Sequence, residues 1–140
     1  MRHDVEVSLE FLPTDGGGRQ GPVRSGYRPQ FCYDGHDWDA VHEFPDADQV
    51  FPGDRARSFI TFLSPSAHWG RLGVGKTFSI REGGRVVAHG RVEQLLDLCE
   101  SAIRERVHEL LESRYRYLVN SSRSFHTDWV GGSHALGGRR

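Results

Sequence analysis

Apolar and polar residues alternate in short runs along the first two thirds of the chain. In residues 5–11, polar residues separate four apolar ones: Val5, Val7, Leu9 and Phe11. This two-residue period is typical of a half-buried strand. The sequence predicts five more strands, at residues 27–33, 40–44, 55–63, 77–81 and 85–92. Six short strands joined by turns favour a closed antiparallel β-barrel, an all-β fold without exposed strand edges.

The period changes after the last of these strands. Apolar residues then recur at steps of three and four: Val92, Leu96, Cys99, Ile103, Val107 and Leu110. They form one stripe of a helix predicted over residues 93–119. We expect the stripe to pack on the barrel; pairing with a partner helix or a second copy is the alternative. Residues 120–140 are rich in Ser, Gly and His and predict a flexible tail. The barrel itself takes residues 1–92.

Composition narrows the class of protein. The chain has 140 residues with 17 glycines and 6 prolines, which suits one turn-rich domain with an appendage. No apolar run is long enough for a membrane span, and residues 1–5 have no apolar signal core. Cys32 and Cys99 lie in unlike contexts, which favours a reduced pair over a disulfide. We therefore expect a soluble, cytoplasmic protein.

Charge is distributed unevenly along the chain. The formal net charge is −1. Residues 34–54 contain seven acids and no base, whereas residues 55–91 contain seven bases and one acid, Glu82. A nucleic acid would favour the second segment and avoid the first. The alternative is that both segments are ordinary solvated strand faces, and the sequence leaves the two interpretations evenly balanced.

Two sequence blocks carry a family resemblance. Residues 26–31 read Gly-Tyr-Arg-Pro-Gln-Phe, and residues 80–85 read Ile-Arg-Glu-Gly-Gly-Arg. Gly17-Gly18-Arg19, Pro52-Gly53-Asp54 and Gly90 fit the same pattern. In this order the segments resemble the C-terminal β-barrel domain (domain 3) of elongation factor Tu, over residues 5–92. The resemblance implies a six-stranded barrel that binds rather than catalyses.

The resemblance also implies a set of contact residues. In the family this barrel touches the T-stem backbone of aminoacyl-tRNA, and the matching positions here are Arg19, Gln30, Arg81, Glu82 and Gly83. Arginine offers forked donors to phosphate, and glycine lets a backbone approach closely. Arg85 and Lys76 would add positive charge. Each of the five residues also has a structural interpretation, as a turn residue or as one member of a pair between strands.

Two hypotheses of function follow. One is a non-catalytic, elongation-factor-like module, without its own GTPase domain, that contacts tRNA or a translation partner. The alternative is a protein-interaction or regulatory adaptor that mimics the barrel without RNA contact. Asp34, Asp37 and Asp39 stand where the family carries a Thr-rich hairpin, and these acids would repel phosphate. They favour the adaptor, whereas the retained contact blocks favour the tRNA module.

Three other site patterns are weak. Residues 70–77 satisfy the P-loop pattern G-x-x-x-x-G-K-[ST], but a P-loop must open a helix, and a strand is predicted here. The histidines lack the ligand spacing of a closed zinc site. No Ser-His-Asp or Cys-His order indicates a nucleophile. We therefore expect no enzyme activity, no cofactor and no metal. The sequence does not indicate the oligomeric state.

Overall fold

A computed structural model describes the chain from residue 2 to residue 135, and side chains up to residue 121. The chain divides into two compact units, Met1–Glu105 and Arg106–Arg140. All six strands lie in the first unit. The helix α1 begins in the first unit and continues into the second.

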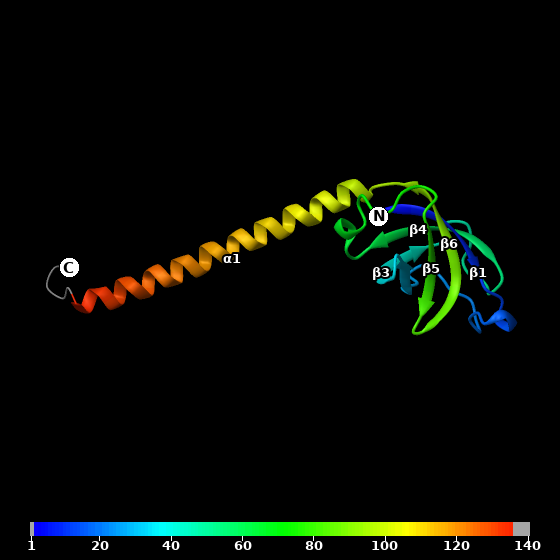
Figure 1. Cartoon of the computed structure of the whole chain (residues 1–140), viewed down its shortest axis with the longest axis horizontal. Helices are drawn as coiled ribbons and strands as arrows, with labels where there is room; N and C mark the ends of the chain where they lie inside the picture. The colour runs from blue at the N-terminus through cyan, green and yellow to red at the C-terminus, as the bar shows by residue number, and fades with distance from the viewer. Residues whose placement is uncertain (1, 136–140) are drawn as a thin grey trace. The chain divides into compact units, whose positions relative to one another are not determined.

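The strands of the first unit close into a barrel (Figure 1). Their order around the barrel is β1-β4-β3-β2-β5-β6, and every neighbouring pair is antiparallel. The bounds are β1 Val5–Phe11, β2 Gln30–Tyr33, β3 His36–Glu43, β4 Arg55–Phe62, β5 Thr77–Glu82 and β6 Arg85–Leu95. The predicted closed six-stranded antiparallel barrel with a C-terminal helix is confirmed.

The barrel core consists of the residues that alternate in the sequence. Val5, Val7, Leu9 and Phe11 point into it and are almost fully buried. Phe31 stacks on Phe78 at 4.1 Å between ring centroids. Burial of such side chains supplies most of the folding free energy, at about 25 cal/mol per Å² of apolar surface.

Two strand boundaries differ from the prediction. β2 begins at Gln30, because Tyr27 makes only an isolated bridge, to His42. β3 begins at His36, within the segment expected to be a turn at residues 34–39. The turn shrinks to Asp34-Gly35, whose φ values of 51° and 78° match a two-residue hairpin of type I′.

Residues 63–76 close one end of the barrel. The 3₁₀ turn η2 (Pro65–Ala67) leads into His68, which has no exposed surface. The His68 ring stacks on Phe62 at 4.0 Å and meets Trp38 edge-on at 4.7 Å. Leu72, 3% exposed, joins the same core.

The helix α1 runs from Leu98 to Ala135. The predicted start at residue 93 is wrong, because β6 continues to Leu95. The helix also extends through most of the segment expected to be a flexible tail, residues 120–140; residues 136–140 lie outside the described part.

The buried face of α1 in the first unit is not the predicted stripe. Leu98 and Ala102 are buried, and the Ser66 backbone N–H donates to Glu105 Oε1 at 2.8 Å. Ile103, expected on the packed stripe, is 56% exposed. The later start of the helix changes which residues face the core. Several large apolar side chains of the second unit are exposed: Val107, Leu110, Leu111, Tyr115, Tyr117 and Leu118.

Candidate functional site

The five residues expected to contact tRNA gather at one end of the β2–β5 pair. Gln30 opens β2 and lies directly opposite Arg81 on β5. Glu82 ends β5, and Gly83 follows in the turn to β6. Arg19, from the loop between β1 and β2, reaches Glu82. The fold therefore brings together residues that are up to 64 positions apart in the sequence.

Arg19 is held by a set of internal hydrogen bonds. Its Nε donates to Glu82 Oε2 at 2.5 Å, and its Nη1 donates to the carbonyl oxygens of Gly21 and Pro22. The Tyr27 hydroxyl donates to the same Glu82 oxygen. Burial, followed by the hydrogen bond to Glu82, raises the pKa of Tyr27. Most of the donors of Arg19 therefore serve the fold.

Gln30 and Arg81 are paired with acids on β3. Gln30 Nε2 donates to Asp39 Oδ1 at 3.0 Å, and Arg81 Nη1 lies 3.3 Å from Asp37 Oδ1. Cys32 on β2 lies opposite Asp37, and burial followed by the hydrogen bond to Asp37 raises the pKa of its thiol to about 12. This part of the surface is close to electrically neutral.

Gly83 leaves its backbone open to a ligand. It sits in the β5–β6 turn with φ of +60°, a left-handed conformation that favours glycine. A Cβ added there would meet nothing within 4 Å. The turn geometry accounts for a glycine here, and the open space leaves room for an approaching backbone.

Sequence reasoning missed two exposed arginines beside this site. Arg24 and Arg28 belong to the loop that leads into β2, and both are exposed, as is Arg85 after the Gly83-Gly84 turn. Among the described residues, these three make no ion pair. Arg28 stands inside the Gly-Tyr-Arg-Pro-Gln-Phe block itself, so the block could have pointed to it. Arg28 and Arg85, each two residues from a site residue, supply unpaired positive charge at this end among the described residues.

The acidic and basic segments of the sequence do not form separate surfaces. Arg57 Nη2 lies 2.9 Å from Asp46, Lys76 Nζ lies 2.8 Å from Asp34, and Arg81 reaches Asp37. Each pair joins one base from residues 55–91 to one acid from residues 34–54. Strand pairing across the barrel therefore mixes the charges that the sequence keeps apart.

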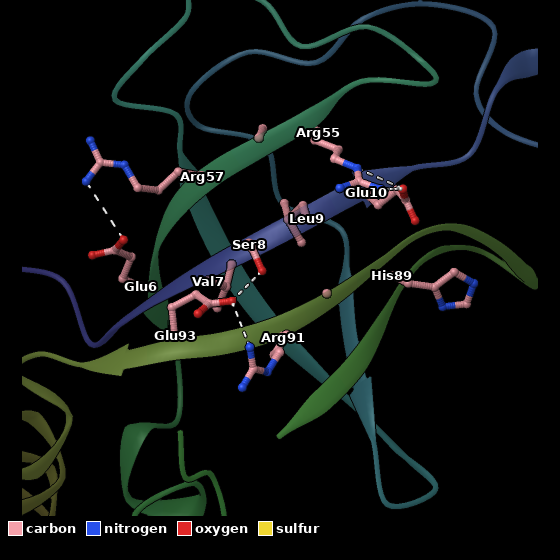
Figure 2. A pocket seen from close by; sticks show the side chains of 12 residues that line it. Glu6, Val7, Ser8, Leu9, Glu10, Arg55, Arg57, His89, Arg91 and Glu93 are labelled. Carbon is pink, nitrogen blue, oxygen red and sulfur yellow. Dashed lines mark hydrogen bonds and ion pairs between the residues drawn. The ribbon is translucent and has the colours of Figure 1, made fainter. Parts of the chain in front are cut away.

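A shallow groove of about 590 Å³ lies on the outer face of β1, β4 and β6 (Figure 2). Arg55 pairs with Glu10 at 3.0 Å, and the Ser8 hydroxyl donates to Glu93 Oε2 at 2.7 Å. Figure 2 shows bases and acids alternating along the groove. Because its arginines pair with its glutamates, the groove favours neither a positively nor a negatively charged ligand.

The remaining site patterns do not gain support. Thr77 begins strand β5, so the P-loop pattern opens a strand, and a phosphate-facing helix N-terminus is missing there. Within the described residues, no three His, Cys, Asp or Glu side chains gather as metal ligands. Over the same part of the chain, no helix is both long and apolar enough to cross a membrane.

Comparison with protein families gives a match for the barrel. Residues 2–96 match the family described as the elongation factor Tu C-terminal domain. The match covers all six strands and ends before α1.

Proposed function

Because the chain belongs to the elongation factor Tu C-terminal domain family, we propose that it is a translation-factor-like binding module that contacts tRNA. The domain of this family is a non-catalytic barrel, so the proposed role is binding without a chemical step. A cytoplasmic location beside the translation machinery goes with this role.

The clustering at the β2–β5 end is the observation that carries the proposal. Gln30 lies directly opposite Arg81, and Gly83 follows two residues after Arg81 in the β5–β6 turn. Arg28 and Arg85, both exposed, add charge without an internal ion pair among the described residues. A-form RNA is recognised through phosphates and 2′-hydroxyl groups, and arginine forks with an open glycine backbone suit such contacts.

The second candidate is a protein-interaction adaptor without RNA contact. Asp37 and Asp39 favour it, because they occupy Arg81 and Gln30 and would repel phosphate. In this role the barrel would engage a protein that normally meets the factor's C-terminal domain.

Anisotropy of a fluorescent aminoacyl-tRNA, titrated with the full chain at low and at physiological salt, tests the first proposal. The Arg28→Gln/Arg85→Gln variant removes free charge without breaking an internal pair. We expect its affinity to fall about tenfold or more at low salt, since each lost phosphate contact weakens binding. Arg55→Gln on β4, the strand opposite β5 in the barrel, is a control outside the site and should bind like the wild type.

Substitution of the acids that pair with Arg81 and Gln30 should strengthen tRNA binding instead of weakening it. Asp37→Asn/Asp39→Asn releases Arg81 and Gln30 and is expected to tighten tRNA binding. Asp46→Asn, which removes the nearer of two carboxylate partners of Arg57 away from the site, should change nothing. If the wild type shows no saturable binding even at low salt, the tRNA role is refuted and the adaptor role stands.

A further inference from the structure

The loop that plugs the barrel end also fixes one exposed arginine. Arg71 lies between two buried anchors, His68 and Leu72. The backbone N–H groups of Arg71 and Leu72 both donate to the His68 carbonyl, at 2.9 and 3.0 Å. His68 is itself held by the Tyr33 hydroxyl, which lies 2.6 Å from its Nδ1. The backbone of Arg71 is therefore positioned before any ligand arrives.

The side chain of Arg71 rests on two aromatic rings. Its guanidinium carbon is 5.7 Å from the Tyr33 ring centroid and 5.9 Å from the Trp38 centroid. Cation–π contacts of this kind hold a guanidinium in place. They use its flat face and leave its N–H edge for an acceptor. Among the described residues, no acceptor meets that edge, and Arg71 is exposed.

Lys76 approaches the same tyrosine from the other end of the loop. Its Nζ is 5.8 Å from the Tyr33 centroid and 2.8 Å from Asp34 Oδ1. Its backbone carbonyl accepts a hydrogen bond from the Val92 N–H at 2.8 Å. A hydrogen bond from Lys76 is the main cause that lowers the pKa of Asp34, and charge on Arg71 and His36 adds to it. Lys76 is thus fixed by this carboxylate, and Arg71 places a second positive charge near it.

We propose that Arg71 and Lys76 form a phosphate-binding site whose ligand is a backbone phosphate of RNA, a second contact that rests on the proposed tRNA function. Arg71 donates hydrogen bonds to the phosphate through its free N–H edge and makes the main contact. Lys76 is shared with Asp34 and supplies charge. In this proposal, the lysine of the Gly-Lys-Thr pattern binds phosphate just before a strand, because β5 begins at Thr77.

The position of this site on the barrel favours RNA as the source of the phosphate. Tyr33 follows Gln30 on β2 by three residues, and Lys76 precedes Arg81 on β5 by five. At about 3.3 Å per residue, the two contact regions are separated by roughly 10–17 Å along these strands. Successive phosphates of one nucleic-acid strand lie only a few Å apart along its axis, so a single RNA strand can reach both regions.

The salt dependence of tRNA binding tests the ligand. Arg71→Gln is expected to weaken binding about tenfold at low salt and to lower the slope of log K against log salt by about one contact. Arg71→Lys keeps the charge but loses the two parallel donors of the guanidinium. Its affinity for tRNA should therefore lie between those of the wild type and Arg71→Gln. Thermal unfolding of each variant checks that the plug stays folded, and Arg55→Gln again serves as the control. Unchanged affinity and slope in Arg71→Gln would overturn the assignment to RNA while the tRNA role stands.

Inorganic phosphate tests the site separately from RNA. In a two-dimensional ¹H–¹⁵N NMR titration we expect saturable shifts of the Arg71 Nε–H and the Trp38 indole N–H, lost in Arg71→Gln and kept in Arg55→Gln. If tRNA fails to bind but these shifts occur, the phosphate site holds and the proposed function fails. If the Arg71 signals do not move, the phosphate site itself is refuted.

Discussion

His42 and His68 are both without exposed surface, and each keeps one ring nitrogen hydrogen bonded and the other unpaired. His42 Nδ1 lies 3.0 Å from Ser58 Oγ, and His68 Nδ1 meets the Tyr33 hydroxyl. Burial lowers the pKa of His42 to about 3 and that of His68 to about 4. Both side chains are therefore neutral in the folded protein near neutral pH.

These two histidines should make the barrel sensitive to mild acid. The unfolded chain binds their protons from about pH 6.5 downward, whereas the folded chain does not. The free energy of unfolding is thus expected to fall as pH drops below about 6.5, by roughly 1 kcal/mol per histidine by about pH 5.5. Urea unfolding across this range measures the slope. His68→Gln should reduce the slope, while His108→Gln, at an exposed position, should leave it unchanged; equal slopes in all three proteins would contradict the assignment.

Gly90 is required by packing. A Cβ built on Gly90 would lie 2.3 Å from the Phe78 ring and 2.8 Å from Leu9 Cδ2. The Phe78 ring cannot move freely, because it stacks on Phe31. Gly90→Ala is therefore expected to lower the free energy of unfolding by about 1–3 kcal/mol. Gly21→Ala, with nothing within 4 Å of the added Cβ, is the control for thermal unfolding. Equal thermal midpoints for Gly90→Ala and Gly21→Ala would show that the core around Phe78 rearranges to accept the added methyl group.

The hydrogen bonds and ion pairs within the site could not be predicted from the sequence. The resemblance located Gln30 and Arg81, but it did not show that they pair with Asp39 and Asp37. Arg81 and Asp37 lie 44 positions apart, and only the strand order β3-β2-β5 brings them together. The free arginines beside them were missed for the same reason, since exposure without an ion pair is a property of the fold.

Among the elements, the strands were predictable and their ends were not. The two-residue period located the strands at residues 5–11 and 55–63, and the turn signals between short runs located the other four. The β2–β3 turn was placed too long, since Asp37 and Asp39 read as turn residues but lie on the outer face of β3. The start of α1 was misplaced because Val92 suits a helix stripe as well as the buried side of β6.

The first turn of α1 is expected to stabilise the barrel, and the later turns are not. Leu98 has no exposed surface, whereas Leu110 is 69% exposed. Leu98→Ala should lower the free energy of unfolding of the barrel by about 2–4 kcal/mol through lost burial and a cavity. Leu110→Ala, the same substitution on the same helix, should change it by less than about 0.5 kcal/mol. Denaturant unfolding followed by tryptophan fluorescence compares them; similar losses would mean that Leu110 is also covered.

At the scale of the whole molecule, the folding unit is longer than the family match. The match ends at residue 96, but the first compact unit continues to Glu105. We expect a chain ending after Glu105 to keep its thermal midpoint within a few degrees. A chain ending after Leu96 loses Leu98, Ala102 and the bond to Ser66, and its midpoint should fall by about 10 °C or more. Equal midpoints for the two shortened chains would show that the first turns of α1 are dispensable.

The hydrogen bonds between the two ends of the barrel segment have a last consequence. The Leu96 N–H donates to the Asp4 carbonyl at 2.9 Å, and the Asp97 N–H donates to that of His3 at 3.0 Å. The segment thus begins and finishes at the same place. Domains with this property tolerate circular permutation and insertion into a host protein. Placing the new chain ends at Asp34-Gly35, an exposed turn, and joining the old ends by a short linker should preserve every strand pair. The barrel could then be inserted into a loop of another protein.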